Sequence, residues 1–352
     1  MQQWGHPPQS DLPYKPTPQT LPAKPQPTSE TAWMTQARKT LVDPAHAGSY
    51  HCVARCVRRS WLCGLNEYLE KSFEHRKPWV EQRILELGGI FACGIYAYAI
   101  MSNHYHLVVH MSPTAANDWS ANEVARRWVK LYPTGKSDTD QLNIEAILQN
   151  AALVKPYRQR LTNLSWLMKS ISEPIARRAN AEDKANGRFW QGRFKCQLLR
   201  DERALLAAMT YVDLNPVRAN MAPGLNRSKY TTVQKRHQAV LKQSEIANQP
   251  LIAMVGVNSL NMPLLTNADY LQLVDYSVRL VHPGKRGAIK ETEPKALTKL
   301  GLDPNHWSAK VQGIGNGYWR VVAEVEDLID LAKQFKQRTL YGIGFARRLK
   351  NS

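Results

Sequence analysis

Residues 90–110, IFACGIYAYAIMSNHYHLVVH, carry the pattern that decides the fold of this 352-residue chain. Residues 90–101 are almost wholly apolar or aromatic, which is typical of a buried central strand. The Ser-Asn pair that follows favours a tight turn, and a second strand begins at His104. Side chains alternate between the two faces of a strand. We therefore expect His104 and His106 on one face and Tyr105 on the other.

Two imidazoles on one strand face have a separation suited to holding one metal ion. The alternative is that both histidines are simply packed or solvent-facing, and the pair alone does not decide between the two. His110 shares the parity of His104 and His106. It lies about 13 Å beyond His106 by strand rise, so we do not expect it to bind the same ion.

The flanking segments predict the rest of an α+β sandwich. Residues 49–57 (SYHCVARCV) alternate like a half-buried strand, and residues 65–87 predict a helix, with Pro78 suited to a helix start. Strand, helix, strand, strand is the first part of a ferredoxin-like antiparallel sheet covered by helices. The helical period returns over residues 161–175, and residues 187–199 predict a hairpin or strand pair.

A helix over residues 202–214 completes this part of the chain. Asp201 is a suitable N-cap for it. Pro216 disfavours the helical region for the residue before it, so we expect the helix to end near Asn215.

Composition divides the chain into three parts. Residues 1–32 are Pro-rich and predict a disordered tail. Residues 33–236 hold the α+β pattern, interrupted at about 112–157 by a polar stretch that we interpret as an insertion with two short helices. Residues 237–352 predict a mainly helical accessory domain.

The charge of the chain indicates a polyanionic partner. Its formal net charge is +18, and nucleic acid is the usual partner of such a field. Between Lys155 and Arg200 there are eleven Lys and Arg residues against three acidic ones, with aromatic residues among them that could stack on unpaired bases. The alternative is an exposed helix beside buried aromatics. The expected DNA contacts are Arg177, Arg178, Arg188, Phe189, Trp190, Arg193, Lys195 and Arg218.

Other classes are excluded or disfavoured. No window approaches the ~18 consecutive apolar residues of a membrane helix, and the N-terminus lacks the pattern of a secretory signal. We therefore expect a cytoplasmic, nucleoid-associated protein with no membrane partner. Five cysteines do not suggest a disulfide framework. Cys52, Cys56 and Cys63 lack an obvious fourth ligand for zinc.

Three blocks of the sequence resemble a known family. They are AYAIMSNHYHLVVH at residues 97–110, GRFWQGRFK at 187–195 and YVDLNPVRA at 211–219. In this order they resemble the HUH single-tyrosine transposases of the insertion-sequence-200-like type, and more closely the REP-associated tyrosine transposases. The resemblance covers about residues 50–236 and is specific only when the blocks are taken together.

The resemblance implies an HUH nuclease fold and a transposase that cleaves and rejoins single-stranded DNA at hairpin or palindromic sites. It implies that His104 and His106 bind Mg²⁺ or Mn²⁺, with Asn215 completing the metal site. It further implies that Tyr211 attacks a DNA phosphate to give a 5′-phosphotyrosine intermediate. The reaction would be a transesterification, which keeps the bond energy for rejoining. The chain is also a candidate for a homodimer.

The residues themselves are compatible with these roles but leave alternatives open. Tyr211 and Asn215 are separated by four residues, so they share one helix face. Tyr211 is equally suited to a protein core, and Asn215 to a helix C-cap. A non-catalytic DNA-binding regulator and an HUH replication initiator or relaxase remain alternative functions. The insertion and residues 237–352 are long for the family, and the tail has no clear match to its guide-reading segment.

Overall fold

The computed structural model describes residues 41–57, 62–66, 71–258, 260, 262, 265–281, 293–318 and 320–351. These residues belong to one compact unit, Arg38–Ser352. The tail predicted over residues 1–32 lies outside the described residues. Within the described ranges, no helix is long and apolar enough to cross a membrane.

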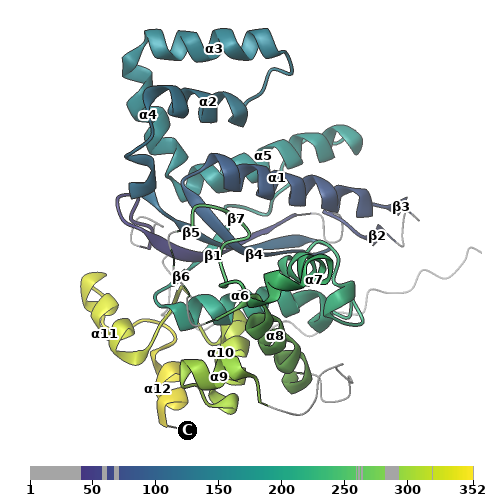
Figure 1. Cartoon of the computed structure of the whole chain (residues 1–352), viewed down its shortest axis with the longest axis vertical. Helices are drawn as coiled ribbons and strands as arrows, with labels where there is room; N and C mark the ends of the chain where they lie inside the picture. Colours follow the sequence, from purple (N-terminus) through teal and green to yellow (C-terminus); the bar gives the residue numbers. More distant parts are fainter. Residues whose placement is uncertain are drawn as a thin grey trace, which may run out of the picture. The chain divides into compact units, whose positions relative to one another are not determined.

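A mixed six-stranded sheet lies at the centre of an α+β fold (Figure 1). Its strand order is β7-β4-β5-β1-β6-β8, and all neighbours are antiparallel except β6 and β8. The prediction of a wholly antiparallel sheet is therefore wrong at the β8 edge, where a strand from the C-terminal part of the chain joins in parallel. The strands are β1 (Gly48–Arg55), β4 (Cys93–Ile100), β5 (His104–Met111), β6 (Lys195–Leu199), β7 (Val255–Gly256) and β8 (Val321–Val322).

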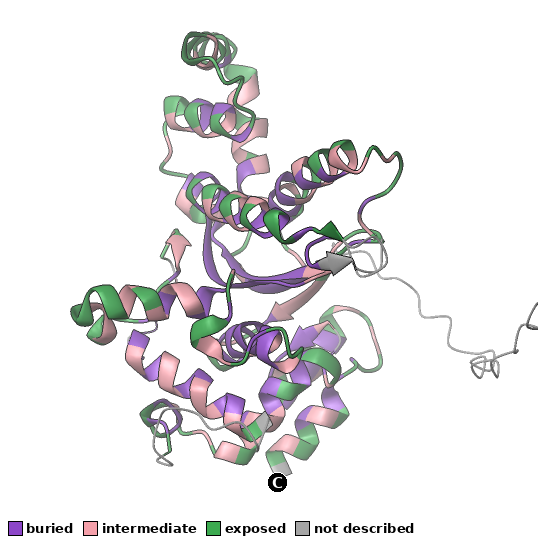
Figure 2. Cartoon of the chain, turned by 90° about the vertical axis from the view of Figure 1, so that its right-hand side faces the viewer, coloured by how far each residue is buried: buried purple, intermediate pink, exposed green. Residues whose placement is uncertain are grey.

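Helices cover both faces of the sheet, and its strands are mostly buried (Figures 1 and 2). Helices α1 (Lys77–Ile90) and α5 (Leu164–Glu182) pack on the face that carries Tyr105 and Leu107, which we call the α1/α5 face. The opposite face, which we call the α6 face, packs against α6 (Glu202–Arg218). Two cores therefore form, one on each side of the sheet.

The chain between the strands departs from the predicted helices in two places. Residues 65–87 were predicted as one helix, but a short hairpin precedes α1, which has Pro78 in its first turn. Polar residues such as Asn66 and Lys71 suit the hairpin. The insertion was predicted to contain two short helices, at about 121–131 and 142–153. It contains three helices beyond the α1 and α5 layer (Figure 1), of which the first matches its predicted range. These elements are β2 (Leu65–Asn66), β3 (Lys71–Ser72), α2 (Ala121–Leu131), α3 (Ser137–Gln149) and α4 (Ala151–Leu161).

Helix α6 continues past the predicted end near Asn215 and reaches Arg218. Pro216 lies in its last turn, where the missing N–H removes only one intrahelical hydrogen bond. The Pro216 carbonyl accepts from the N–H groups of Met221 and Ala222, so the end of the helix is closed by the chain that follows it. Because the helix extends this far, its last turn includes the basic residue Arg218.

The C-terminal part of the chain builds directly onto α6 and the sheet. It supplies β7 and β8, and α8 and α10 pack against α6. A division at residue 237 stays a prediction, although contacts join both sides of it into one compact unit. The helices of this part and the one before it are α7 (Thr232–Lys242), α8 (Asn267–Val281), α9 (Lys295–Leu300), α10 (Pro304–Asn316), α11 (Val325–Gln334) and α12 (Ile343–Asn351).

A buried carboxyl group joins three of these helices. Asp213 of α6 accepts hydrogen bonds from the Tyr270 hydroxyl of α8 at 2.6 Å and from the Val233 N–H of α7 at 3.0 Å. Burial raises the pKa of Asp213 to about 7, against the opposing effect of these hydrogen bonds and of nearby Arg236. The fold therefore favours the protonated carboxyl.

This raised pKa predicts a pH-dependent contribution to stability. The contribution is fully present below the ordinary Asp pKa of 3.8 and is lost as pH rises through about 7. Asn cannot ionise, so we expect the free energy of unfolding of Asp213→Asn to rise relative to wild type by about 1.4 kcal/mol for each pH unit of this window. Urea denaturation at about pH 4.5 and about pH 7.5 measures the difference. The exposed Asp330→Asn is the control, and a constant difference for Asp213→Asn would contradict the prediction.

Candidate active site

Three histidines from two neighbouring strands gather on the α6 face. His104 and His106 project from the same face of β5, as the strand alternation predicts, and their Nε2 atoms lie 3.0 Å apart. His51 of β1 joins them, with its Nε2 atom 2.9 Å from Nδ1 of His106. The rings of His51 and His106 are stacked, with centroids 5.2 Å apart. The site is thus a row of three imidazoles.

Burial keeps this row uncharged. It lowers the pKa of His51 to about 4 and that of His106 well below its ordinary value. Burial and the charge of Arg55 together lower the pKa of His104 to about 4. A neutral imidazole has one nitrogen with a free lone pair, which is the form that binds metal ions. At neutral pH the row is therefore able to offer ligand nitrogens.

Tyr211 lies over the row from the opposite layer. Its ring meets the rings of His51 and His106 edge-on, each at a centroid distance of 5.9 Å. The Arg218 guanidinium lies 4.9 Å from the centroid of the same ring. Tyr211, Asn215 and Arg218 are spaced by four and three residues, so α6 presents them on one face. Helix and strand together place a hydroxyl, three imidazoles and a guanidinium in one site.

Asn215 has a defined position in this arrangement. Its Nδ2 donates to the Tyr211 carbonyl at 3.0 Å, one turn back along α6. Because the nitrogen is used in this way, the amide oxygen is the atom left to accept or to bind a cation. In the described ranges there is no group of three or more His, Cys, Asp or Glu side chains arranged to hold a metal ion. The metal site predicted from His104, His106 and Asn215 stays a prediction.

The other tyrosines near the histidine strand have structural roles. Tyr105 points to the α1/α5 face, as predicted, and its hydroxyl lies 3.0 Å from Ser172 Oγ. Tyr96 and Tyr98 are fully buried, and the Tyr98 hydroxyl donates to Glu81 at 2.9 Å. All three side chains are buried in the protein core. The tyrosine ring that contacts His51 and His106 is that of Tyr211.

The predicted DNA contacts separate into two groups. Lys195 is exposed and pairs with Val53, which pairs in turn with His106, so it lies two strands from the histidine row. Arg188 and Arg193 are exposed in the segment before β6, and Arg218 lies at the Tyr211 ring. Arg218 is therefore part of the site, and Lys195 lies on a strand beside it.

The second group belongs to the α1/α5 face. Phe189 is 2% exposed, and the Trp190 indole N–H donates to the Ser172 carbonyl at 2.7 Å, so the core holds these two rings. The Phe189 ring is therefore closed to base stacking in this structure, which corresponds to the buried-aromatic alternative, whereas the Trp190 ring is only partly buried. Arg177 pairs with Glu173, and Arg178 lies over the Trp79 ring; both belong to α5, across the sheet from the histidines.

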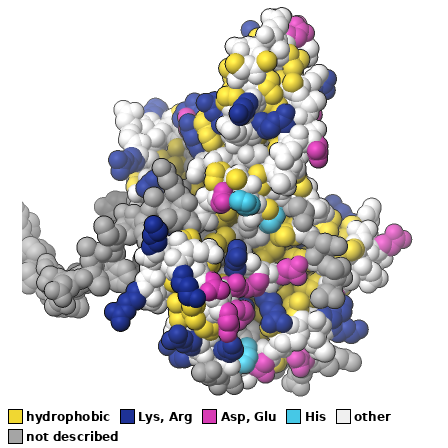
Figure 3. All heavy atoms as spheres, turned by 90° about the vertical axis from the view of Figure 1, so that its left-hand side faces the viewer, with side chains coloured by type: hydrophobic (Ala, Val, Ile, Leu, Met, Phe, Trp, Pro, Cys, Tyr) yellow, Lys and Arg dark blue, Asp and Glu magenta, His cyan; other side chains and the backbone are white. Residues whose placement is uncertain are grey.

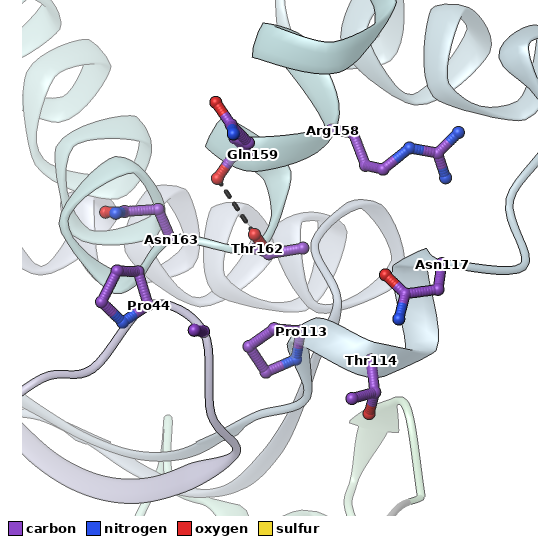
Figure 4. Close-up of a pocket in the computed structure, with 9 residues that line it drawn as sticks. Pro44, Pro113, Thr114, Asn117, Arg158, Gln159, Thr162 and Asn163 are labelled. Atoms are coloured by element: carbon purple, nitrogen blue, oxygen red, sulfur yellow. Dashed lines mark hydrogen bonds between the residues drawn. The ribbon is translucent and has the colours of Figure 1, made fainter.

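Figures 3 and 4 show two further features of the surface. A pocket of about 550 Å³ lies beyond the opposite end of β5, lined by residues that include Pro113, Arg158 and Asn163 (Figure 4). On the face drawn in Figure 3, Lys and Arg side chains are intermixed with Asp and Glu side chains. The described side chains of that face therefore form no continuous basic stripe.

Sequence reasoning missed His51, the third imidazole. The alternation of residues 49–57 places His51 opposite Tyr50 and Cys52, but alternation does not say which strand lies alongside. In the sheet His51 pairs with Val108, so its side chain reaches diagonally to His106. A strand pairing between β1 and β5 is the signal that would have found it.

No family model and no curated protein matches the chain. Among solved structures, the chain is similar to a REP-associated tyrosine transposase bound to a REP hairpin. The sequence identity is 12% and the TM-score is 0.34, over 61% of this chain and 93% of that chain. The likeness is distant in both sequence and structure.

Proposed function

We propose that this chain is a metal-dependent transposase or strand transferase that cleaves and rejoins single-stranded DNA through Tyr211. The observation that carries the proposal is the position of Tyr211 edge-on to His51 and His106, beside two histidine Nε2 atoms 3.0 Å apart. A hydroxyl nucleophile beside paired neutral imidazoles is an arrangement suited to phosphoryl transfer.

The sheet supports the finer fold proposal, a ferredoxin-like HUH arrangement. Strands β1, β4, β5 and β6, joined by α1 and α5, have the spatial order β4-β5-β1-β6. This is the antiparallel order of a split βαβ pair, with both crossover helices on one face. The histidines lie on the α6 face, which the crossover helices α1 and α5 do not cover. Helix α6 packs on this face and carries Tyr211.

The donor atoms support Mg²⁺ or Mn²⁺ as the cofactor. Two imidazole nitrogens and one amide oxygen suit Mn²⁺ better than the oxygen-seeking Mg²⁺. His104, His106 and Asn215 would hold the ion. When bound, it would withdraw charge from the scissile phosphate.

The chain's own residues account for the rest of the chemistry. The Tyr211 oxygen forms a bond to the phosphorus and the bond to the DNA 3′ oxygen breaks. The phenol proton is released to solvent, and the 3′ oxygen takes a proton to become a hydroxyl. Arg218, 4.9 Å from the Tyr211 ring centroid, carries positive charge beside the phosphate. Reversal of these steps with a new 3′-hydroxyl rejoins the strand.

The proposal is tested by a covalent-adduct experiment. The full chain is incubated with hairpin single-stranded DNA, labelled at either end, and Mn²⁺. We expect a denaturation-resistant protein–DNA adduct that carries only the fragment whose 5′ phosphate was attacked. Binding without any adduct across a series of hairpins would instead support a non-catalytic DNA-binding regulator.

The exposed basic residues at the start of β6 and just before it predict a salt-dependent contribution to DNA affinity. Replacing Arg188, Arg193 and Lys195 together with Ala removes up to three positive charges that neutralise DNA phosphates. We expect the slope of log affinity against log salt to fall by about 0.7 for each phosphate that is no longer neutralised. Fluorescence anisotropy with labelled single-stranded DNA measures the slope.

A matched control replaces three exposed basic residues of the insertion, Arg126, Lys130 and Lys136. The two triple variants remove the same charge, so the control corrects for net charge alone. Equal slopes for both would show that the segment before β6 has no special role in binding DNA.

A further inference from the structure

The C-terminal end of α10 holds the side chain of Gln197, which lies beside the histidine row. Gln197 Nε2 donates to the carbonyls of Ile314 and Tyr318 at 3.1 and 3.0 Å. A carbonyl only accepts, so these two bonds fix which end of the amide is nitrogen. Gln197 Oε1 then faces His51 Nδ1 at 2.7 Å and must accept a hydrogen bond from it.

This hydrogen bond assigns the protons of the next two imidazoles. With its proton on Nδ1, neutral His51 has a lone pair on Nε2, which accepts from His106 Nδ1 at 2.9 Å. His106 is then left with a lone pair on Nε2, directed at Nε2 of His104. At the other side, Asn103 Oδ1 lies 2.6 Å from His104 Nδ1 and holds the proton of His104 there. Both facing Nε2 atoms are therefore free to bind a cation.

The same end of α10 also touches the tyrosine. A Cβ atom on Gly315 would lie 2.8 Å from the Tyr211 hydroxyl oxygen and 3.2 Å from its ring. Gly315 thus lets the helix backbone approach the hydroxyl closely. The neighbouring Gly313 faces a different partner, Phe345 of α12. Gly315 therefore allows α10 to approach the site, and Gly313 allows it to approach α12.

We propose that the C-terminal end of α10 positions both halves of the site: the histidines through Gln197 of β6, whose side chain it holds, and the tyrosine through its own Gly315. Gln197 sets the tautomers of His51 and His106, so that the Nε2 lone pair of His106 faces His104. Gly315 sets the position of the Tyr211 hydroxyl. The C-terminal part of the chain is then an integral part of the active site. The assignment of these roles rests on the proposed function of the same site.

Histidine tautomers are the direct test of the first role. In the full wild-type chain with ¹⁵N-labelled histidine, we expect long-range ¹H–¹⁵N spectra to show His51 and His106 protonated on Nδ1 alone. In Gln197→Leu the hydrogen-bond acceptor is lost, and we expect both to become tautomer mixtures. Titration with Mn²⁺ alone should show an affinity reduced about tenfold or more, the range for loss of a partner behind a metal ligand.

Gln312→Leu, on an exposed part of α10, is the matched control and should match wild type. Unchanged histidine spectra in Gln197→Leu would overturn the role of Gln197. The spectra need neither DNA nor metal, so they decide this role even if the wild type forms no DNA adduct. An adduct that forms normally in Gln197→Leu with mixed tautomers would leave the proposed function standing and remove the positioning role.

Gly315→Ala tests the second role. We expect adduct formation to slow by about tenfold or more, because small displacements of a nucleophile cost large factors in rate. Mn²⁺ affinity should be unchanged, because the added methyl group faces the tyrosine. Gly344→Ala, which adds a methyl group where nothing lies within 4 Å, is the matched control.

A thermal-unfolding measurement tests the role of Gly315 independently of any catalytic activity. The fall in Tm caused by Gly315→Ala should be smaller in a Tyr211→Phe background, where the hydroxyl that the methyl group meets is absent. Equal falls in both backgrounds would overturn the contact between Gly315 and the tyrosine hydroxyl.

Discussion

Tyr211→Phe is expected to abolish the covalent adduct, with a fall of at least about a thousandfold in its rate of formation. The variant removes only the oxygen that forms the bond to phosphorus, and no other group on the α6 face replaces it. The aromatic ring remains, so its edge-on packing against His51 and His106 is kept. We therefore expect the affinities for hairpin DNA and Mn²⁺ to stay within about threefold of wild type.

Two other tyrosines serve as controls for this experiment. Tyr132 is 46% exposed on the insertion, and Tyr98 is fully buried with its hydroxyl on Glu81. Tyr132→Phe should form adduct at the wild-type rate, as should the fraction of Tyr98→Phe that folds. An adduct that persists in Tyr211→Phe would show that another residue is the nucleophile.

His104→Ala has the second large expected effect, a loss of at least about a hundredfold in Mn²⁺ affinity. One of only two facing imidazole nitrogens is removed, and outer partners alone already change affinity by about ten- to a hundredfold. His104 is only partly buried, so its loss leaves a smaller cavity than loss of His106 would. Calorimetric titration with Mn²⁺ measures the effect.

His110→Ala is the matched control for the metal experiment. His110 lies on the same strand and face, but its ring is hydrogen-bonded to Ser49 at 2.8 Å. Its removal should leave Mn²⁺ affinity near the wild-type value. If both variants lose affinity equally, the ion is not held by the pair at the start of β5. If neither variant loses Mn²⁺ affinity, His104 has a packing role and does not bind the ion.

The histidine pair and the tyrosine face could be predicted because they depend on local periodicity. Alternation along β5 places His104 and His106 together whatever the rest of the fold, and the i, i+4 spacing does the same for Tyr211 and Asn215. The order of β1, α1, β4, β5, α5, β6 and α6 followed from the same patterns. The buried roles of Tyr96, Tyr98 and Tyr105 were also evident from their place in apolar strands.

The remaining parts of the site depend on contacts between distant segments. His51 reaches His106 only through the pairing of β1 with β5, and Gln197 reaches α10 across more than a hundred residues. Periodicity carries no signal for such contacts. Phe189 and Trp190 were predicted to stack on bases because they lie among basic residues in the sequence. In the fold the Phe189 ring is buried in the core, and the partly buried Trp190 ring packs against it.

The C-terminal part of the chain shows the same limit. The helical patterns at 268–280 and 321–335 were visible in the sequence and correspond to α8 and α11, but α9, α10 and α12 were not predicted. The strands β7 and β8 are only two residues long and have no pattern of their own. They form because the sheet edges offer hydrogen bonds to short segments that pass beside them. The parallel pairing of β8 with β6, together with the Gln197 hydrogen bonds, is what brings α10 to the tyrosine.

Mass-spectrometric mapping of the protein–DNA adduct tests the central claim most directly. The adduct formed with Mn²⁺ and hairpin DNA is digested with protease and nuclease, and the modified peptide is sequenced. The account predicts a nucleotide joined through its 5′ phosphate to Tyr211, and the matching DNA fragment should end in a 3′-hydroxyl. A nucleotide on any other residue, or one joined through its 3′ phosphate, would contradict it.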